Sequence, residues 1–129
     1  MKFKSLFAII LLLGLFSCHA QPSQNIKTVE VTAFAKEIKK TKKPQIIDVR
    51  TPEEFAEGHI KNAANIDWQG DQFLLNADKL NKNKPVYVYC RSGKRSQKAS
   101  EKLAELGFKE IYNLNGGYLK WKTEAKTAQ

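Results

Sequence analysis

The spacing of apolar and polar residues changes repeatedly between Ile26 and Thr123. Short runs rich in β-branched and aromatic residues predict strands at 28–31, 45–49, 63–66, 86–89 and 110–112. Between them, apolar side chains recur every three or four residues, which is typical of helices. This alternation predicts an α/β fold, with a parallel sheet between layers of helices. The run at 86–89 is apolar or aromatic throughout, so we expect a central strand covered on both faces.

Capping signals locate the helices. Thr51 is the expected N-cap of one helix, because Pro52 suits the first helical position and Glu54 completes a capping box. Thr32 is expected to cap an earlier helix that carries Phe34 on its buried side. Further helices are predicted near 73–80, from 96 to 106 ahead of Gly107, and around 118–121.

The N-terminal segment has the pattern of a secretory signal. Two lysines precede an almost continuous apolar run from Leu6 to Phe16, and small residues follow it. Leu15-Phe16-Ser17-Cys18 resembles a bacterial lipobox, in which the cysteine is lipidated and becomes the first mature residue. The alternative is ordinary cleavage after Ala20. We therefore expect an exported, periplasmic lipoprotein anchored to the membrane through Cys18.

These signals divide the chain. We assign residues 1–17 to the signal peptide, 18–25 to a tether, 26–123 to one domain and 124–129 to a polar tail. The domain is expected to be monomeric.

Composition changes the picture in two ways. The net charge is +9, which suits small anions, anionic lipid surfaces or nucleic acid, but export argues against nucleic acid. Most of the lysines are expected to lie on a solvated surface. The chain has two cysteines, and Cys18 is either lipidated or removed. The mature domain therefore has one thiol, Cys90, and forms no internal disulfide.

Cys90 follows the predicted central strand and precedes a predicted helix. At such a turn, backbone N–H groups and the positive end of the helix converge, so they stabilise a thiolate. Ser92 and Gly93 supply flexible backbone for a tight cradle. Arg91, Lys94 and Arg95 are expected to attract an anionic substrate and to favour the thiolate further. A buried and inert cysteine would instead have apolar neighbours within a helix or strand.

Three groups of residues stand out in combination. They are Ile47-Asp48-Val49-Arg50 with Glu54-Phe55 and Gly58-His59-Ile60 followed by Ala63; Val88-Tyr89-Cys90-Arg91-Ser92-Gly93-Lys94-Arg95-Ser96; and Asn113-Leu114 with Gly116-Gly117-Tyr118 and Trp121. Together they resemble the rhodanese family of sulfurtransferases. The resemblance spans about Val29 to Trp121. One departure is Asn62, where many members have Gly before Ala63.

The resemblance implies a three-layer domain with a central five-stranded parallel sheet. It also implies that Cys90 is the catalytic residue, which takes sulfane sulfur from a small anionic donor such as thiosulfate. The persulfide would then pass its sulfur to cyanide in the assay or to a thiol in the cell. Arg91 directly after the cysteine resembles members that use thiosulfate, and the loop from Arg91 to Arg95 would bind the substrate.

Four charged or polar residues outside the loop are assigned structural roles. Asp48 ends a strand, Arg50 is expected to pair with Glu54 across the start of the capped helix, and His59 lies in a turn beside Gly58. Two histidines and one mature cysteine are too scattered to suggest a metal site, and we expect no cofactor.

Two alternative functions stay open. Cysteine phosphatases and arsenate reductases of the related fold place an arginine six residues after the cysteine. Here the sixth position is Ser96, and Arg95 comes one residue early, so the loop is one residue shorter. The second alternative is a non-catalytic binding or sulfur-carrier module that uses the loop only for docking.

Overall fold

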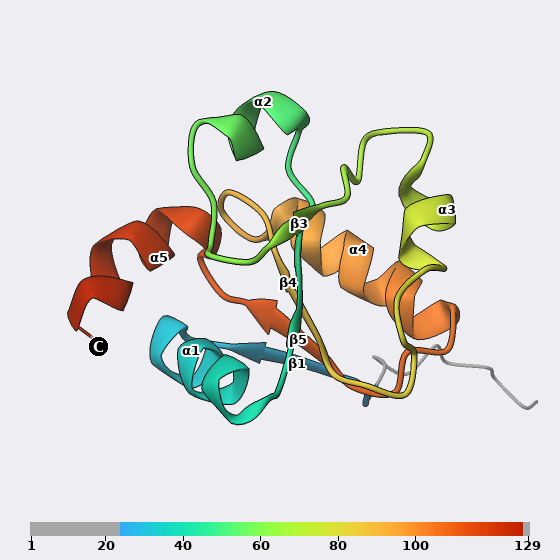
Figure 1. Ribbon diagram of the computed structural model, residues 1–129, viewed down its shortest axis with the longest axis horizontal. Coiled ribbons are helices and arrows are strands. Elements are labelled where there is room, and N and C mark those ends of the chain that lie inside the picture. The colour runs from blue at the N-terminus through green and yellow to red at the C-terminus, as the bar shows by residue number, and fades with distance from the viewer. Residues whose placement is uncertain (1–23, 128–129) are drawn as a thin grey trace, which may run out of the picture.

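The computed structural model describes residues 24–127. A five-stranded, wholly parallel sheet with the order β1-β5-β4-β2-β3 crosses the domain (Figure 1). Its strands are β1 (Ile26–Val29), β2 (Gln45–Asp48), β3 (Ala64–Asn65), β4 (Val86–Tyr89) and β5 (Ile111–Leu114). The α/β class and the five-stranded parallel sheet expected from the sequence are confirmed.

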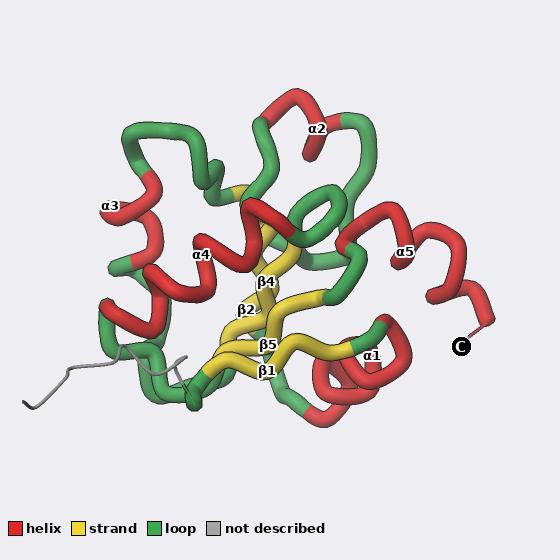
Figure 2. The backbone as a smooth tube through the Cα atoms, turned by 180° about the vertical axis from the view of Figure 1, so that it is seen from behind, coloured by secondary structure: helices red, strands yellow, loops and turns green. Residues whose placement is uncertain are grey.

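Helices cover both faces of the sheet (Figure 2). They are α1 (Val31–Lys40), α2 (Pro52–Ala56), α3 (Phe73–Ala77), α4 (Lys94–Glu105) and α5 (Gly117–Glu124), followed by the 3₁₀ turn η1 (Ala125–Thr127). Side chains of α1 and α5 pack in one apolar cluster, and side chains of α3 and α4 pack in the other. The short α2 lies beyond the carboxyl end of β2, on the side of the loop that follows β4 (Figure 1).

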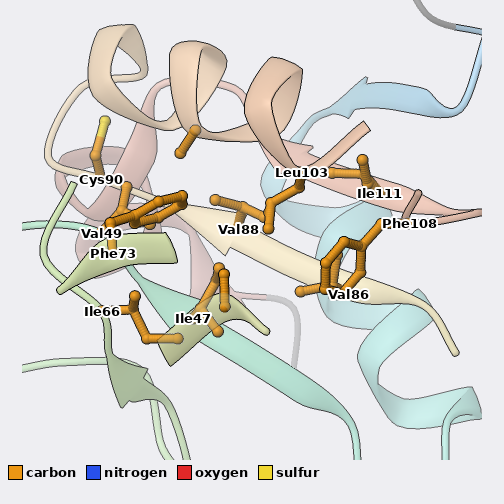
Figure 3. Close-up of a cluster of buried hydrophobic side chains, with 12 residues drawn as sticks. Ile47, Val49, Ile66, Phe73, Val86, Val88, Cys90, Leu103, Phe108 and Ile111 are labelled. Carbon is orange, nitrogen blue, oxygen red and sulfur yellow. The ribbon is translucent and has the colours of Figure 1, made fainter. Parts of the chain in front are cut away.

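Strand β4 divides its side chains between the two clusters. Val86 and Val88 face α3 and α4, whereas Tyr87 and Tyr89 face α1 and α5. All four are at most 1% exposed, which confirms the expected central strand. Cys90 continues the first series and lies at the end of the cluster shown in Figure 3.

Local signals located some element boundaries correctly and others not. The capping box is confirmed: Thr51 Oγ1 accepts from the Glu54 N–H at 3.3 Å, and the Glu54 carboxylate accepts from the Thr51 N–H at 3.5 Å. Thr32 is not a cap, because α1 begins at Val31 with Glu30 as its N-cap. Val31 is fully buried, so it serves as a core residue of the first helical turn and not as the end of a strand.

One strand and one helix begin earlier in the chain than the sequence predicted. Strand β1 begins at Ile26, where it pairs with Ile111 of β5. Helix α4 begins at Lys94, two residues before the expected start, because Gly93 adopts a left-handed conformation at its N-cap. Ala125, in the expected polar tail, packs against the cluster that contains α5.

Within residues 24–127, no helix has the length and apolar content needed to cross a membrane. The expected signal peptide and Cys18 lie outside the described residues.

Candidate active site

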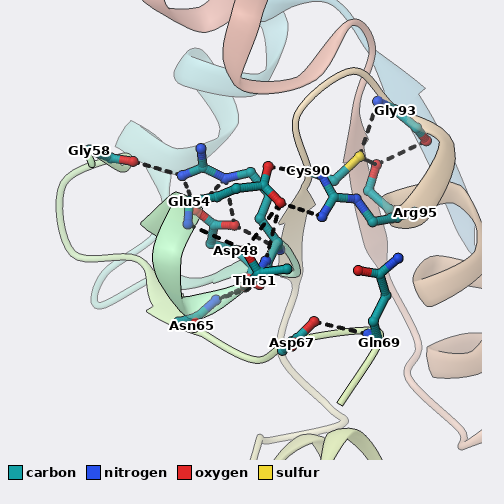
Figure 4. A network of polar contacts seen from close by, with 12 residues as sticks. Asp48, Thr51, Glu54, Gly58, Asn65, Asp67, Gln69, Cys90, Gly93 and Arg95 are labelled. Carbon is teal, nitrogen blue, oxygen red and sulfur yellow. Dashed lines mark hydrogen bonds and ion pairs between the residues drawn. The ribbon is translucent and has the colours of Figure 1, made fainter. Parts of the chain in front are cut away.

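Cys90 lies immediately after β4, at the carboxyl edge of the sheet. Its side chain is nearly covered, with 1% of the residue exposed. The Gly93 N–H donates to Sγ at 3.0 Å (Figure 4). Oγ of Ser96 accepts from the Cys90 thiol at 3.4 Å, and the Ser96 hydroxyl donates to the Gly93 carbonyl at 3.1 Å. The sulfur is therefore enclosed by the turn that joins β4 to α4.

This enclosure controls the acidity of the thiol. Burial opposes ionisation, because a thiolate loses solvation in the interior. Hydrogen bonding with the Ser96 hydroxyl and with the N–H groups of Ser96, Gly93 and Ser92 outweighs that effect and holds the pKa of Cys90 below its ordinary value. The sequence predicted a lowered thiol pKa from converging N–H groups, and three such groups lie at the sulfur.

The three cations of the loop contribute differently from what the sequence predicted. Arg91 and Lys94 extend into solvent, as does Ser92. Arg95 forms a bidentate ion pair with Glu54 of α2, with nitrogen–oxygen distances of 2.7 and 2.9 Å. The lowered pKa of Cys90 arises mainly from hydrogen bonds, whereas the exposed Arg91 and Lys94 remain available to attract an anion to the loop.

Glu54 therefore has a different partner from the one expected. Arg50 does not pair with it; its guanidinium turns inward to Asp48, with an Nη2–Oδ2 distance of 2.6 Å. The buried Asp48 carboxylate offers Arg50 two acceptor oxygens, and the Gly58 carbonyl accepts a further bond at 2.7 Å. The Arg95 guanidinium instead lowers the pKa of Glu54 to about 2.

The Asp48–Arg50 pair links the elements around the site. The Arg50 guanidinium lies over the ring of Tyr118 in α5, 4.4 Å from its centroid, and 5.7 Å from that of Tyr89. The Tyr89 hydroxyl accepts from the Ile60 N–H at 3.0 Å. One buried cation thus connects β2, β4, the turn after α2 and the start of α5, which fits the structural roles assigned to Asp48 and Arg50.

The start of α5 holds the backbone of the nucleophile in place. The N–H groups of Tyr118 and Leu119 donate to the carbonyls of Cys90 and Arg91 at 2.8 and 3.1 Å. Gly117 makes this approach possible: a Cβ there would lie 2.5–2.6 Å from the backbone of Arg91 and Cys90. Sequence reasoning noted Gly117 only within the motif Gly116-Gly117-Tyr118, because the contact joins residues distant in sequence.

Ser96 is the other site residue that sequence reasoning did not select. It was noted as the residue in the sixth position after the cysteine and as the end of the loop motif, and was given no role in the site. Its side chain is fully buried beside Sγ, although serine is usually exposed. The available signal was its place on the buried side of α4, together with Ala99, Ser100 and Leu103.

His59 lies apart from this chemistry. Its ring stacks on Phe55 with centroids 3.8 Å apart, and Nδ1 contacts the Phe55 carbonyl at 3.0 Å. Among residues 24–127, no group of three or more histidine, cysteine or acidic side chains is placed to hold a metal ion.

Comparisons with known proteins agree with this arrangement. Residues 31–124 match the model of the rhodanese-like domain. The chain is 45% identical over 80 residues to the uncharacterized protein YqhL of Bacillus subtilis, covering 62% of each chain. It is 41% identical over 83 residues to the thiosulfate sulfurtransferase GlpE of Coxiella burnetii, covering 64% of this chain and 76% of that one.

A solved structure shows the same fold. The rhodanese-like domain protein of Staphylococcus aureus superposes with a TM-score of 0.66 at 36% identity, covering 74% of this chain and 90% of that one. The family match extends from α1 to the end of α5 and includes the whole Cys90 loop. The chain belongs to the rhodanese-like domain family.

Proposed function

We propose that this protein is a sulfurtransferase that moves sulfane sulfur from a donor such as thiosulfate to a thiophilic acceptor through a persulfide on Cys90. One observation carries the proposal: Sγ of the single thiol in the described domain receives the Gly93 N–H at the carboxyl end of the central strand. Donors placed in this way stabilise a thiolate, which is the nucleophilic form of cysteine.

The first step is attack of the Cys90 thiolate on the outer sulfur of thiosulfate. A new S–S bond forms to Sγ, the S–S bond of thiosulfate breaks, and sulfite leaves with the electron pair. In the second step an acceptor, cyanide in the assay or a thiolate in the cell, attacks the outer sulfur of the persulfide. The Sγ–S bond breaks, and the thiolate is regenerated on Cys90 beside Gly93 and Ser96.

The loop suits this substrate. Arg91 and Lys94 are exposed at its rim, where positive charge raises the local concentration of a small dianion. The Ser92 and Gly93 backbone turns N–H groups toward the sulfur, so the same donors suit the thiolate and the anionic persulfide.

Phosphate or arsenate chemistry is less well supported by these contacts. It needs an arginine that reaches a tetrahedral oxyanion held in the loop. Here the Arg95 guanidinium is bound by both carboxylate oxygens of Glu54, and the sixth position holds the small, buried Ser96. A loop one residue shorter would enclose a smaller ligand, such as the outer sulfur of a persulfide.

The test compares two cysteine variants. Cys90→Ser is expected to fold normally and to lose essentially all thiosulfate:cyanide sulfurtransferase activity, since a hydroxyl forms no persulfide. Cys18→Ser removes the other thiol of the chain and should retain the turnover number when both are assayed in detergent. Substantial turnover by Cys90→Ser, or efficient hydrolysis of an aryl phosphate by the unmodified protein, would refute the proposal.

The location of the enzyme is a separate part of the proposal. The apolar run from Leu6 to Phe16 and the lipobox-like sequence ending at Cys18 support export to the periplasm and lipid anchoring. A monomeric domain held in this way would meet water-soluble donors and thiol acceptors.

A further inference from the structure

Lysines that are distant in sequence lie together at the edge of the sheet where its strands begin. All five strands run in one direction, so the segments that precede them meet at one edge. The segment before β2 carries Lys42 and Lys43, the one before β4 carries Lys82 and Lys84, and the one before β5 carries Lys109. Backbone contacts join these segments: the Lys109 N–H donates to the Lys82 carbonyl at 3.1 Å.

Helix ends add further lysines to this edge. Helices α1 and α4 connect consecutive parallel strands, so their carboxyl ends lie where the next strand begins (Figure 1). We call the resulting surface the basic edge. It consists of Lys27, Lys39, Lys40, Lys42, Lys43, Lys79, Lys82, Lys84, Lys102 and Lys109.

The basic edge carries almost all of the domain's excess charge. Its carboxylates, Glu37, Asp78, Glu105 and Glu110, each pair with one of the lysines at 2.8–3.4 Å. Six lysines of the edge are outside any ion pair described for residues 24–127, and all six are exposed: Lys39, Lys42, Lys43, Lys79, Lys84 and Lys109. The rest of the described domain has ten Lys and Arg residues and nine Asp and Glu residues, so its charges nearly cancel.

The edge also lies where the chain enters the domain. Strand β1 begins there at Ile26, eight positions after Cys18, the expected site of lipidation. Eight residues span at most about 29 Å. A lipid on Cys18 would therefore hold the basic edge within that reach of a membrane. A lipid anchor followed at short range by exposed lysines fits an anionic bilayer.

Nucleic acid fits this surface less well. Proteins that bind single strands use exposed aromatic rings on which bases stack. The aromatic residues nearest the edge are Tyr87, Phe108 and Tyr112, and none of them is more than 7% exposed.

We propose that the basic edge docks on anionic phospholipid headgroups. The Cys90 loop lies at the opposite, carboxyl edge of the same sheet, next to α2 (Figure 1). Docking through the lysines therefore turns the loop away from the membrane and leaves it open to water-soluble substrates. The inference does not involve Cys90, so its failure would leave the sulfur-transfer proposal unaffected.

The experiment measures partition of the protein, as processed in a bacterial host, onto phosphatidylcholine vesicles with and without phosphatidylglycerol. The ratio of the two partition coefficients isolates the contribution of charge, because the membrane anchor at the N-terminus contributes to both. Lys42→Glu/Lys84→Glu/Lys109→Glu reverses three exposed charges of the basic edge. This ratio should fall about 100-fold or more, given the usual attraction of each basic residue to an anionic surface. Lys94→Glu/Lys98→Glu/Lys122→Glu is the matched control, and should retain most of the ratio.

A footprint gives an independent readout on the unmodified chain. On phosphatidylglycerol vesicles, an amine-reactive reagent should label the basic edge more slowly than on phosphatidylcholine vesicles, while Lys94, Lys98 and Lys122 react equally on both. High salt should remove the difference. Equal losses of partition by the two triple variants, equal labelling of both lysine sets, or displacement from vesicles by single-stranded RNA at matched phosphate concentration would overturn the proposal.

Discussion

Gly117 offers the sharpest structural test of how the nucleophile is positioned. A Cβ at this residue would lie 2.5 Å from the Arg91 carbonyl oxygen and 2.6 Å from that of Cys90. Neither atom can give way alone, because the adjacent N–H groups of α5 donate to the same two carbonyls. Gly117→Ala must therefore move the start of α5 away from the catalytic loop.

The expected loss separates into two parts. Gly117 has a φ of +60°, and placing alanine in that conformation costs about 1–2 kcal/mol. The backbone overlap adds a steric contribution, for a total of about 3–4 kcal/mol. Gly107→Ala is the matched control: its φ is +96°, but a Cβ there meets nothing within 4 Å. It should lose only the conformational part and keep its sulfurtransferase activity.

Urea unfolding of both variants measures the two losses, and the thiosulfate:cyanide assay measures activity. Gly117→Ala should lose the larger free energy of unfolding and most of its turnover. If the two variants were equally stable and equally active, the contact between α5 and the loop would not position Cys90.

Three further predictions follow from the site and the N-terminus. Ser96→Ala should raise the pKa of the Cys90 thiol, so the rate of alkylation by iodoacetamide should rise at a higher pH than in the unmodified protein. An unchanged midpoint would show that Ser96 does not lower the thiol pKa. Glu54→Gln should cost about 1 kcal/mol at neutral pH, because the Arg95 pair holds the folded pKa of Glu54 near 2, below the unfolded value of about 4.5. The difference in urea stability should shrink as pH falls from about 4.5 toward 2, and a constant difference would contradict this assignment. Cys18→Ala should abolish incorporation of labelled palmitate in a bacterial host, whereas soluble, unlabelled wild type beginning at Gln21 would indicate ordinary cleavage.

The sequence predicted the parts of this molecule that depend on local signals. The Thr51 capping box and the apolar strand 86–89 are both present, because hydrogen bonds within one turn and burial on both faces leave direct patterns in the sequence. The position of Cys90 at the carboxyl end of that strand followed from the same patterns.

Contacts between distant segments were not predictable in the same way. The spacing of Arg50 and Glu54 suggested a pair, but Glu54 binds Arg95, which is 41 residues away. The choice depends on the buried Asp48 carboxylate, whose oxygens are within reach of Arg50 only once the strand and the following turn have formed. The approach of Gly117 to the Cys90 carbonyl likewise depends on the docking of α5.

The central claim is that Cys90 carries the transferred sulfur, and mass spectrometry of the intact protein and of its peptides tests it most directly. After brief incubation with thiosulfate, the unmodified protein should gain the mass of one sulfur atom on the peptide that contains Cys90. Cyanide should remove that sulfur, and Cys90→Ser should gain none. A protein that turns over thiosulfate without this added mass, or that acquires it equally in Cys90→Ser, would contradict the account.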